Sequence, residues 1–432
     1  MNNKKLILVE LNEINFELIK KYLNEGYKLD EFEKIINEDL ITTKSETEYK
    51  FLEPWIQWAS VHTGKEFNEH RLFHLGDINK SKIKQIFEIV ENKGYSVGAI
   101  SPMNASNKLV NASYFVSDPW INTKSDNSFD SKIISQLLSQ IINNNSSSKI
   151  TFKSFISLIY IFIKFVRLRK YLSFIVLIFD SIFKKWSKAI FLDLLIHEIH
   201  LSLYKKKKPN FSTVFFNAGA HIQHHYFFNS KVLEESDMIN PEWYVKKKND
   251  PILEILTYYD SILNEIRNIK ETEVVISTGL SQKPYDRVKY YYRLKDHDKF
   301  LRLFDFEYLK VLPRMSRDFL VISQSNEHAK EIKSILEKIK VNNRHFLFEY
   351  IKIYKNELFV SLTYPNEINN STYIEYKKKK INLKNLVSFV AIKNGMHSET
   401  GYLYLSKNLK KIDIFNGMNI KNIFKIIDNY FE

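Results

Sequence analysis

Short apolar runs alternate with segments of helical spacing along much of the chain. Runs rich in β-branched and aromatic residues predict buried strands at residues 4–11, 96–100, 213–216 and 273–277. Apolar residues three and four positions apart predict helices at residues 14–22, 83–92, 252–269 and 327–339. Strands separated by helices favour an α/β fold, in which a mostly parallel sheet is covered by helices on both faces.

The pattern changes in the middle of the chain. Residues 122–149 are rich in Asn and Ser, which predicts a linker or surface loop, and residues 149–208 then combine long apolar stretches with basic residues. This second segment contains 13 Lys and Arg against three acidic residues, a net charge of +10 out of +14 for the whole chain. We therefore expect residues 1–148 and 209–432 to form the α/β core and residues 149–208 to form a basic amphipathic helical insertion.

Neither apolar stretch of this insertion is long enough for a transmembrane helix. Lys164 interrupts the first and Asp180 the second, whereas a span needs about 18 to 20 uninterrupted apolar residues. Basic amphipathic helices instead suit in-plane binding to an anionic membrane surface. The alternative is a helical cap whose apolar face packs on the core, and one segment can do both.

The composition is that of a globular protein, with 44% hydrophobic and 26% charged residues among 432. The absence of cysteine excludes disulfides, thiolate metal sites and cysteine nucleophiles, so any metal must be bound by His, Asp, Glu or Asn. An excess of 64 Lys and Arg over 50 Asp and Glu indicates an anionic partner. The basic residues interleave with aliphatic runs, which argues against nucleic acid as that partner.

The first residues lack the pattern of a secretory signal. The apolar run at residues 6–9 stops at Glu10, whereas a signal needs an apolar run of at least about seven residues. We expect a cytoplasmic protein that contacts the inner face of the cytoplasmic membrane peripherally.

Ligands of a parallel sheet bind at the carboxyl ends of its strands, so the polar residues there are the candidate site. Glu10-Leu11-Asn12-Glu13 ends the first predicted strand, where the Glu10 carboxylate is placed to bind a metal and Asn12 to bind a substrate. The alternative is that Asn12 caps the helix that follows.

A second polar segment, residues 53–64, is dense in Trp, Gln, Ser, His and Thr. This composition is typical of a site loop that leads into a helix N-terminus, where backbone amides can hold an anion. The segment supplies the candidate catalytic residues Glu53, Gln57, Ser60, His62 and Thr63, and Trp55 as a candidate substrate-binding residue. The alternative is that Trp55 and Trp58 belong to the core.

Three histidines follow the strand predicted at residues 213–216. If residues 217–226 are helical, His221, His224 and His225 share one face, and imidazoles at this spacing can converge on a metal or a phosphate. The alternative is that they are surface or packing residues.

Two weaker strand-end candidates, residues 277–282 and 395–401, contribute Thr278, Gln282 and His397. By contrast, His197-Glu198-Ile199-His200 is one residue short of the metalloprotease H-E-x-x-H spacing, and we interpret it as structural.

In this order, the strand-end motifs resemble the alkaline phosphatase superfamily, especially its type I phosphodiesterase and sulfatase-like branch. The matching segments are Glu10, the segment ending in Thr63-Gly64, Asn217 with His221, Ser277-Thr278-Gly279, and Gly395-Met396-His397. The resemblance covers most of the chain outside residues 149–208. It implies an alkaline phosphatase-like fold and the metal ligands Glu10, Asn217, His221 and His397.

Several positions depart from the family pattern. Asn217 stands where the family has Asp, and Thr278 and Gly279 stand where it has Asp-His, so about half of a two-metal site is missing. The nucleophile position falls on or near Pro54, which has no group that can attack a substrate. The most that the resemblance implies is one divalent metal (Zn, Mn or Mg) on Asn217, His221 and His397, together with a second cation on Glu10.

The motifs also look like those of a divergent bacterial subgroup associated with surface-polysaccharide gene clusters. The resemblance implies a hydrolase or transferase that acts on a phosphoryl-type, sulfate or related group of a cell-envelope polysaccharide or lipid-linked precursor. In such an enzyme, His62 or His224 would activate a hydroxyl or a water. The substrate would be bound by Asn12, Trp55, His225, Thr278 and Gln282. The alternative is a catalytically degenerate member that binds an anionic glycan or lipid as a scaffold.

Overall fold

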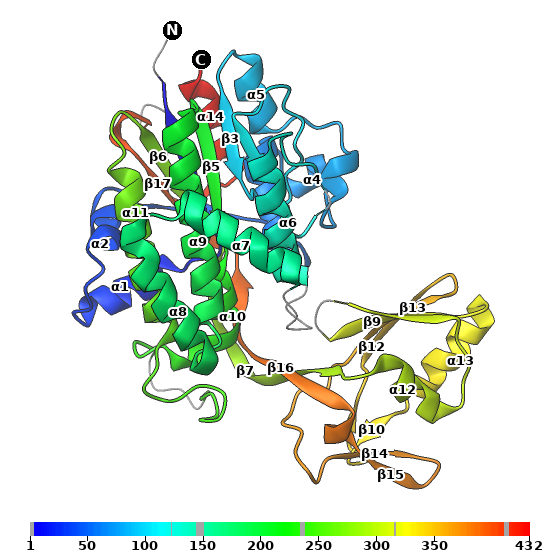
Figure 1. The fold of residues 1–432 in the computed structure, drawn as a ribbon. Coiled ribbons are helices and arrows are strands. Elements are labelled where there is room, and N and C mark those ends of the chain that lie inside the picture. The colour runs from blue at the N-terminus through cyan, green and yellow to red at the C-terminus, as the bar shows by residue number, and fades with distance from the viewer. Residues whose placement is uncertain (1–3, 122, 144–150, 234–237, 315–316, 410–413) are drawn as a thin grey trace. The chain divides into compact units, whose positions relative to one another are not determined.

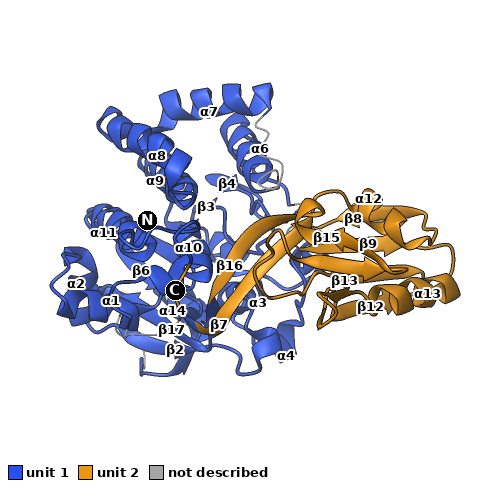
Figure 2. Ribbon diagram, turned by 90° about the horizontal axis from the view of Figure 1, so that it is seen from below, with its two compact units in different colours: residues 1–236, 241–284, 395–432 blue, residues 237–240, 285–394 orange. Residues whose placement is uncertain are grey.

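The computed structural model describes residues 4–121, 123–143, 151–233, 238–314, 317–409 and 414–432 (Figure 1). The chain divides into two compact units (Figure 2). The first contains residues 1–236, 241–284 and 395–432, and the second contains residues 237–240 and 285–394.

An eight-stranded sheet forms the centre of the first unit, with the order β18-β2-β17-β6-β1-β5-β3-β4. Its strands are β1 (Leu6–Leu11), β2 (Ile41–Lys44), β3 (Val97–Ile100), β4 (Tyr114–Val116), β5 (Phe211–Phe216), β6 (Glu273–Ser277), β17 (Thr400–Leu405) and β18 (Met418–Asn419). The run β6-β1-β5-β3-β4 is parallel, and β17 is antiparallel to both of its neighbours. The predicted mostly parallel sheet is confirmed, and the four predicted strands are β1, β3, β5 and β6.

Both faces of this sheet are covered by helices, as predicted. Because side chains alternate along a strand, Ile7 and Val9 of β1 join one core, whereas Leu6 and Leu8 join the other. The first core contains side chains from α1 (Phe16–Asn24), α2 (Asp30–Asn37), α6 (Phe129–Asn143), α9 (Ser187–Lys207), α10 (Ala218–Tyr226) and α11 (Pro251–Arg267). The second contains side chains from α3 (Pro54–Thr63), α5 (Ile86–Asn92) and α14 (Asn422–Tyr430), and the short α4 (Phe67–His70) follows α3.

One prediction in this unit is wrong. We predicted a linker or loop at residues 122–149, but residues 129–143 form helix α6, and residues 144–150 lie outside the described ranges. The reason is the apolar stripe of Ile134, Leu137 and Leu138, whose helical spacing buries them against the sheet despite the polar composition around them.

The predicted basic segment is helical and consists of α7 (Phe152–Phe165), α8 (Tyr171–Phe183) and α9. Helix α9 packs on β5, α10 and α11, so this segment belongs to the first unit. In the described ranges, none of the helices is both long and apolar enough to cross a lipid bilayer.

The second unit has its own core and was not distinguished in the sequence. Its sheets have the orders β12-β13-β9-β8 and β11-β10-β14-β15, and β7 pairs with β16. The strands are β7 (Ser281–Leu294), β8 (Lys310–Pro313), β9 (Asp318–Ile322), β10 (Lys340–Val341), β11 (His345–Phe346), β12 (Tyr350–Tyr354), β13 (Glu357–Ser361), β14 (Tyr373–Tyr376), β15 (Lys379–Asn382) and β16 (Val387–Ser398), with helices α12 (His297–Leu301) and α13 (Asn326–Leu336). The boundaries of residues 285–394 fall inside the continuous strands β7 and β16, so no linker composition marks them.

Candidate functional site

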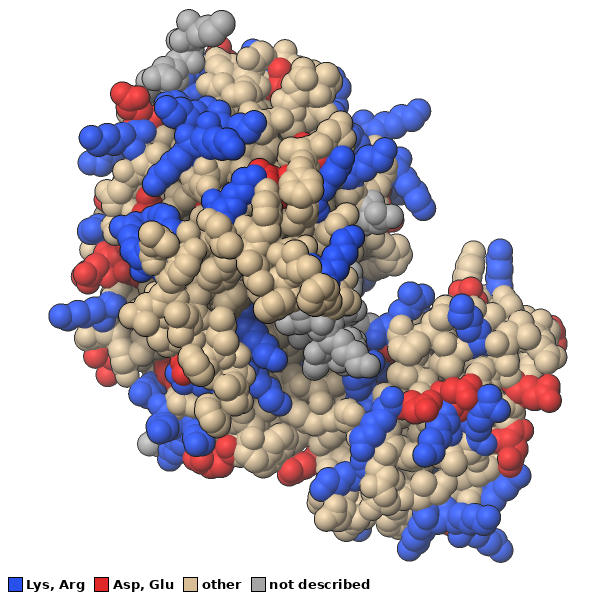
Figure 3. Space-filling model, in the orientation of Figure 1, with Lys and Arg blue, Asp and Glu red and all other residues tan. Residues whose placement is uncertain are grey.

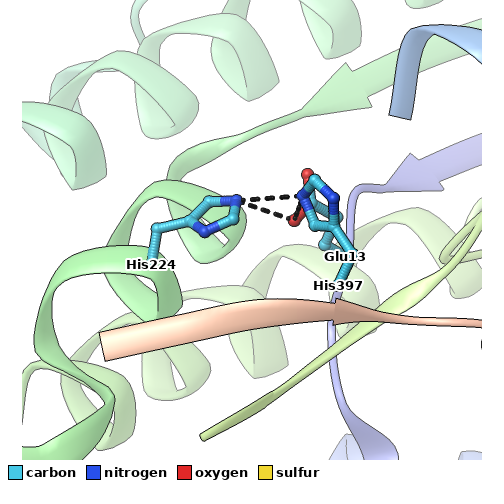
Figure 4. Close-up of side chains that lie close together, drawn as sticks. All are labelled: Glu13, His224 and His397. Carbon is cyan, nitrogen blue, oxygen red and sulfur yellow. Dashed lines mark hydrogen bonds and ion pairs between the residues drawn. The ribbon is translucent and has the colours of Figure 1, made fainter. Parts of the chain in front are cut away.

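Three side chains from distant parts of the first unit meet beyond the end of β1 (Figure 4). The Oε2 atom of Glu13 lies 3.1 Å from Nε2 of His224 and 3.2 Å from Nε2 of His397, and the two Nε2 atoms are 3.2 Å apart. Glu13 is buried, whereas the side chains of His224 and His397 are 29% and 12% exposed. We call these three residues the Glu13 cluster.

The backbone of Glu13 is held in an uncommon conformation. Its φ angle is 60°, in the left-handed region that non-glycine residues rarely adopt. The Glu13 N–H donates to the Thr278 carbonyl at 3.0 Å, and its carbonyl accepts from the Gln223 side chain at 2.9 Å. The turn after β1 therefore aims the carboxylate at helix α10.

Two amide side chains orient the Glu13 carboxylate. Asn12 Nδ2 donates to Oε1 at 3.0 Å, and Gln282 Nε2 donates to Oε2 at 2.6 Å. We predicted both residues as substrate-binding, and the structure places both on the Glu13 carboxylate. The alternative prediction that Asn12 caps a helix is wrong, because Asn15 is the residue that caps α1 by accepting from Leu18 N–H.

The electrostatics of the cluster favour ionised groups. Burial alone would raise the pKa of the Glu13 carboxyl, but the charges and hydrogen bonds of His397 and His224 hold it well below its usual range. Burial lowers the pKa of His397, but the charge and hydrogen bond of Glu13 outweigh it and raise the pKa of that imidazole. The cluster thus contains two imidazoles that share one carboxylate oxygen.

Of the three histidines on α10, His224 is the one that reaches Glu13. His221 is exposed, and its ring centroid lies 4.8 Å from that of His225. The helical spacing was predicted correctly. Residues on one helix face are nevertheless too far apart for all of them to contact one ion, and His221 and His225 do not join the cluster. The metal role predicted for His221 has no support in this geometry.

Asn217, which precedes α10, connects to the cluster indirectly. Its Oδ1 accepts from Asn12 Nδ2 at 2.8 Å, the same amide that binds Glu13. Trp58 Nε1 donates to Asn12 Oδ1 at 2.8 Å, so Trp58 is a buried residue that also positions Asn12.

The predicted site loop at residues 53–64 is helix α3 itself. Pro54 occupies its first turn, where its missing N–H costs nothing, and Gly64 ends it with a φ of 68°. Glu53 is the N-cap residue, with a side chain that is 36% exposed and an Oε2 atom 4.0 Å from Nδ1 of His397. Of the candidates in this segment, Glu53 therefore lies beside the cluster.

The other α3 candidates make structural contacts. Their hydrogen bonds run from Ser60 Oγ to the Ile56 carbonyl, from Thr63 Oγ1 to the Ala59 carbonyl, from Gln57 Nε2 to the Phe51 carbonyl and from Trp55 Nε1 to the Phe73 carbonyl. His70 Nδ1 accepts from Leu72 N–H, so its other nitrogen carries the proton and donates to Ser60 Oγ. His70 is therefore not a base for Ser60.

Glu10 and His62 form a separate buried pair. Glu10 Oε1 lies 3.1 Å from His62 Nε2 and accepts from Thr213 Oγ1 at 2.6 Å. Glu10 shares the face of β1 with Leu6 and Leu8, so its side chain points to the second core and away from α10. Neither the metal role predicted for Glu10 nor the catalytic role predicted for His62 is served by this enclosed position.

The donor geometry of the Glu13 cluster fits a divalent metal. A tetrahedral ion with ligands at about 2.0–2.1 Å keeps neighbouring donor atoms about 3.3 Å apart, close to the 3.1–3.2 Å measured here. Two His nitrogens and one carboxylate are also a donor set that Zn²⁺ accepts. Of the predicted metal ligands, His397 lies here; His224 was predicted as catalytic, and Glu13 was missed although its position just after β1 was a signal.

A second cluster, His197 with Glu198 and Glu265, has a similar set of donors. Here Arg167 pairs with both carboxylates, and Lys170 Nζ lies 3.0 Å from Glu265. His197 Nε2 lies 3.2 Å from the same carboxylate. Bound cationic side chains take the place of a metal, which agrees with the structural role that we predicted for His197-Glu198-Ile199-His200.

Comparison with known proteins gave structural neighbours alone. No family model and no curated protein matches the chain. Among solved structures, it is similar to murine ectonucleotide pyrophosphatase/phosphodiesterase 5 (10% identity, TM-score 0.45, 99% of this chain and 95% of that chain covered). It is also similar to phosphonoacetate hydrolase from Sinorhizobium meliloti (10%, 0.42, 100% and 96%) and to the alkaline phosphatase PafA (9%, 0.45, 97% and 94%).

At this identity and these TM-scores, the role of each residue has to be argued from the chain itself.

Proposed function

We propose that this protein is a metal-dependent hydrolase or transferase that acts on a phosphoryl-type, sulfate or related group. The observation that carries the proposal is the triangle of Glu13 Oε2, His224 Nε2 and His397 Nε2, with sides of 3.1–3.2 Å. A divalent ion on these three side chains would supply a Lewis acid to an oxygen of the substrate group.

The surrounding residues support this role by fixing the ligands. Asn12 donates to Oε1 of Glu13 and Gln282 donates to Oε2, the oxygen that both histidines contact, and such support orients a ligand and raises its affinity for metal. Glu53 is the partly exposed carboxylate beside His397, and we assign it the acceptance of a proton from an attacking water or hydroxyl.

The substrate that we propose is a cell-envelope polysaccharide or its lipid-linked precursor, met at the inner face of the cytoplasmic membrane. Two features support it: the net charge of +14, which favours an anionic partner, and the resemblance of the motifs to a subgroup associated with surface-polysaccharide gene clusters. The diphosphate of a lipid carrier is an anion of this kind.

The second candidate function is a non-catalytic scaffold that binds an anionic glycan or lipid. The observation that favours it is that the Ser60 and Thr63 hydroxyls donate hydrogen bonds to carbonyls of their own helix. In the described residues, neither of these candidate catalytic hydroxyls is directed at the Glu13 cluster. A scaffold would still bind its ligand but would show no turnover.

The test is the metal content of the untagged protein, purified without chelator and measured by elemental analysis. We expect about one divalent ion per chain, lost in His224→Ala and His397→Ala but retained in His221→Ala. The last variant is a matched control because it removes an exposed histidine one turn away on the same helix.

Turnover is then measured on phosphate monoesters, phosphate diesters and sulfate esters with each metal-loaded protein. Metal without turnover on any ester, together with binding of an anionic glycan, would favour the scaffold. Equal metal content in wild type and in both cluster variants would contradict the metal site.

A further inference from the structure

Helices α7 and α8 expose an unusual amount of apolar surface. In the described part of the chain, 25 large apolar side chains are exposed, and 13 of them lie within residues 152–183. They are Phe152, Phe155, Ile156, Ile159 and Ile163 of α7, Leu168 of the turn, and Leu172, Ile175, Val176, Ile178, Phe179, Ile182 and Phe183 of α8. We call these residues the α7–α8 face.

The spacing of these residues makes the face continuous along each helix. Positions 152, 155, 156, 159 and 163 follow the helical repeat, as do 172, 175, 176, 179, 182 and 183. The opposite sides of the helices bury Ile161, Phe165, Phe174 and Leu177 in the first core. Each helix is therefore packed on one side and apolar on the side that faces solvent, where monomeric soluble proteins rarely carry large patches.

Cationic residues flank this face, and acidic ones are almost absent from it. Lys153 and Lys164 lie near the ends of α7. Arg169 and Lys170 precede α8 and pair with Glu265, and Lys184 follows α8 and pairs with Asp180 and Glu254. Between residues 151 and 192 the single acidic residue is Asp180, whose carboxylate lies 2.9 Å from Lys184 Nζ. Figure 3 looks onto this side of the molecule, where tan surface covers the helices and blue side chains surround it.

A basic hollow opens at the C-terminal end of α7. Its volume is about 440 Å³, and its lining includes the cations Lys164, Arg167, Lys205 and Lys206 with one acidic residue, Glu198. Arg167 is paired with Glu198, and Lys164 with Asp130. Lys205 and Lys206 are exposed and have no ion pair among the described residues, so they are available to an anionic ligand.

We infer that the α7–α8 face binds the surface of an anionic phospholipid membrane, with both helices lying in the plane of the interface. Apolar side chains would enter the boundary between headgroups and acyl chains, while the flanking cations and the basic hollow attract lipid phosphates. A second copy of the chain fits less well, because a symmetric contact would bring two cationic borders together. This inference stands apart from the proposed catalytic function.

The test is co-sedimentation of the full chain with vesicles of phosphatidylcholine alone or of phosphatidylcholine mixed with phosphatidylglycerol. We expect binding to the mixed vesicles that weakens at high salt. Phe179→Glu, at a position that is 66% exposed, should weaken binding at least about tenfold. Phe415→Glu, the matched control at a position that is 58% exposed, should bind as wild type does.

The charge contribution is tested by Lys205→Glu with Lys206→Glu, and the control is Lys246→Glu with Lys247→Glu, a pair of exposed lysines elsewhere in the first unit. The first pair should weaken binding to the mixed vesicles, and the control pair should leave it intact. Absence of vesicle binding, or equal binding of Phe179→Glu, would overturn the inference. So would sedimentation showing a wild-type dimer that Phe179→Glu converts to a monomer, because the face would then be covered by a second copy.

Discussion

The Glu13 cluster and the His197 cluster contain the same types of donor, yet they differ in what else touches their carboxylates. Around Glu198 and Glu265 the partners are guanidinium and ammonium groups, which neutralise both acids. Around Glu13 they are the amides of Asn12 and Gln282 and two imidazoles. Amides orient a carboxylate without neutralising it, so the surroundings of the donors, rather than their number, separate a candidate metal centre from a structural ion-pair network.

The largest expected effect distinguishes the two clusters by metal affinity. Glu13→Gln keeps the shape of the side chain but removes the anionic ligand, so stoichiometric Zn²⁺ binding should be lost. Glu265→Gln is the matched change in the His197 cluster and should leave Zn²⁺ binding unchanged. Isothermal titration of both variants measures this difference, and equal loss in the two would erase the distinction that we draw.

The next effect concerns folding stability. Arg167→Met should lower the free energy of unfolding by about 3–5 kcal/mol, because it leaves Glu198, which is 0% exposed, without its cation. Arg287→Met is the control, since its ion pair with Asp286 is exposed and such pairs contribute about 0–1 kcal/mol. Urea unfolding of both variants is the measurement, and a loss below about 1 kcal/mol for Arg167→Met would show that the network is not stabilising.

A smaller effect depends on pH and concerns His200, which lies close to the His197 cluster. Burial, with a further contribution from the charge of His197, lowers the pKa of His200 to about 3. The pKa of His200 is therefore lower in the folded protein than in the unfolded chain, where it is about 6.5. The contribution of His200 to the free energy of unfolding is complete above pH 6.5 and is lost as the pH falls towards 3. At pH 5 the loss is about 2 kcal/mol.

His200→Gln should remove this part of the pH dependence, as measured by urea unfolding at pH 7.5 and pH 5. The exposed His345→Gln is the control and should keep the wild-type slope. An unchanged slope in His200→Gln would mean that this histidine does not resist protonation in the folded protein.

The smallest expected effect lies outside both clusters. Ser60→Ala removes a buried hydroxyl that donates to the Ile56 carbonyl, so we expect a change of about 1 kcal/mol in stability and less than about twofold in turnover of any ester substrate. Steady-state kinetics on wild type and variant would check this. A loss of about a thousandfold or more would instead identify Ser60 as the nucleophile.

The sequence predicted the sheet better than the site. Strands β1, β3, β5 and β6 are mostly apolar runs buried on both faces. Such runs can be recognised in the sequence without knowing which strands lie beside them. Helix α6 was missed because its Asn and Ser residues masked a short apolar stripe. The second unit was missed because its main segment, residues 285–394, begins and ends inside the strands β7 and β16, without a change in composition.

The site was predicted in part, for reasons of geometry. The motif order led to His397, and the helical spacing led to the three histidines of α10, but spacing does not say which of His221, His224 and His225 meets a partner from another element. The assignment of Glu10 over Glu13 depended on which side of β1 each carboxylate occupies. That is decided by the strand register and by the left-handed turn after Leu11, neither of which is visible in the residue types.

The left-handed backbone at Glu13 places a trade-off between stability and function on a single residue. A side chain in this conformation costs about 1–2 kcal/mol that glycine avoids, so the carboxylate is present at a position where the backbone alone would favour glycine. Under selection for stability alone, Glu13→Gly would be favoured, because glycine adopts this backbone conformation without strain. The same substitution would remove a ligand of the cluster. Variants selected for heat resistance alone are therefore expected to lose the Glu13 carboxylate, and with it the proposed metal-dependent activity.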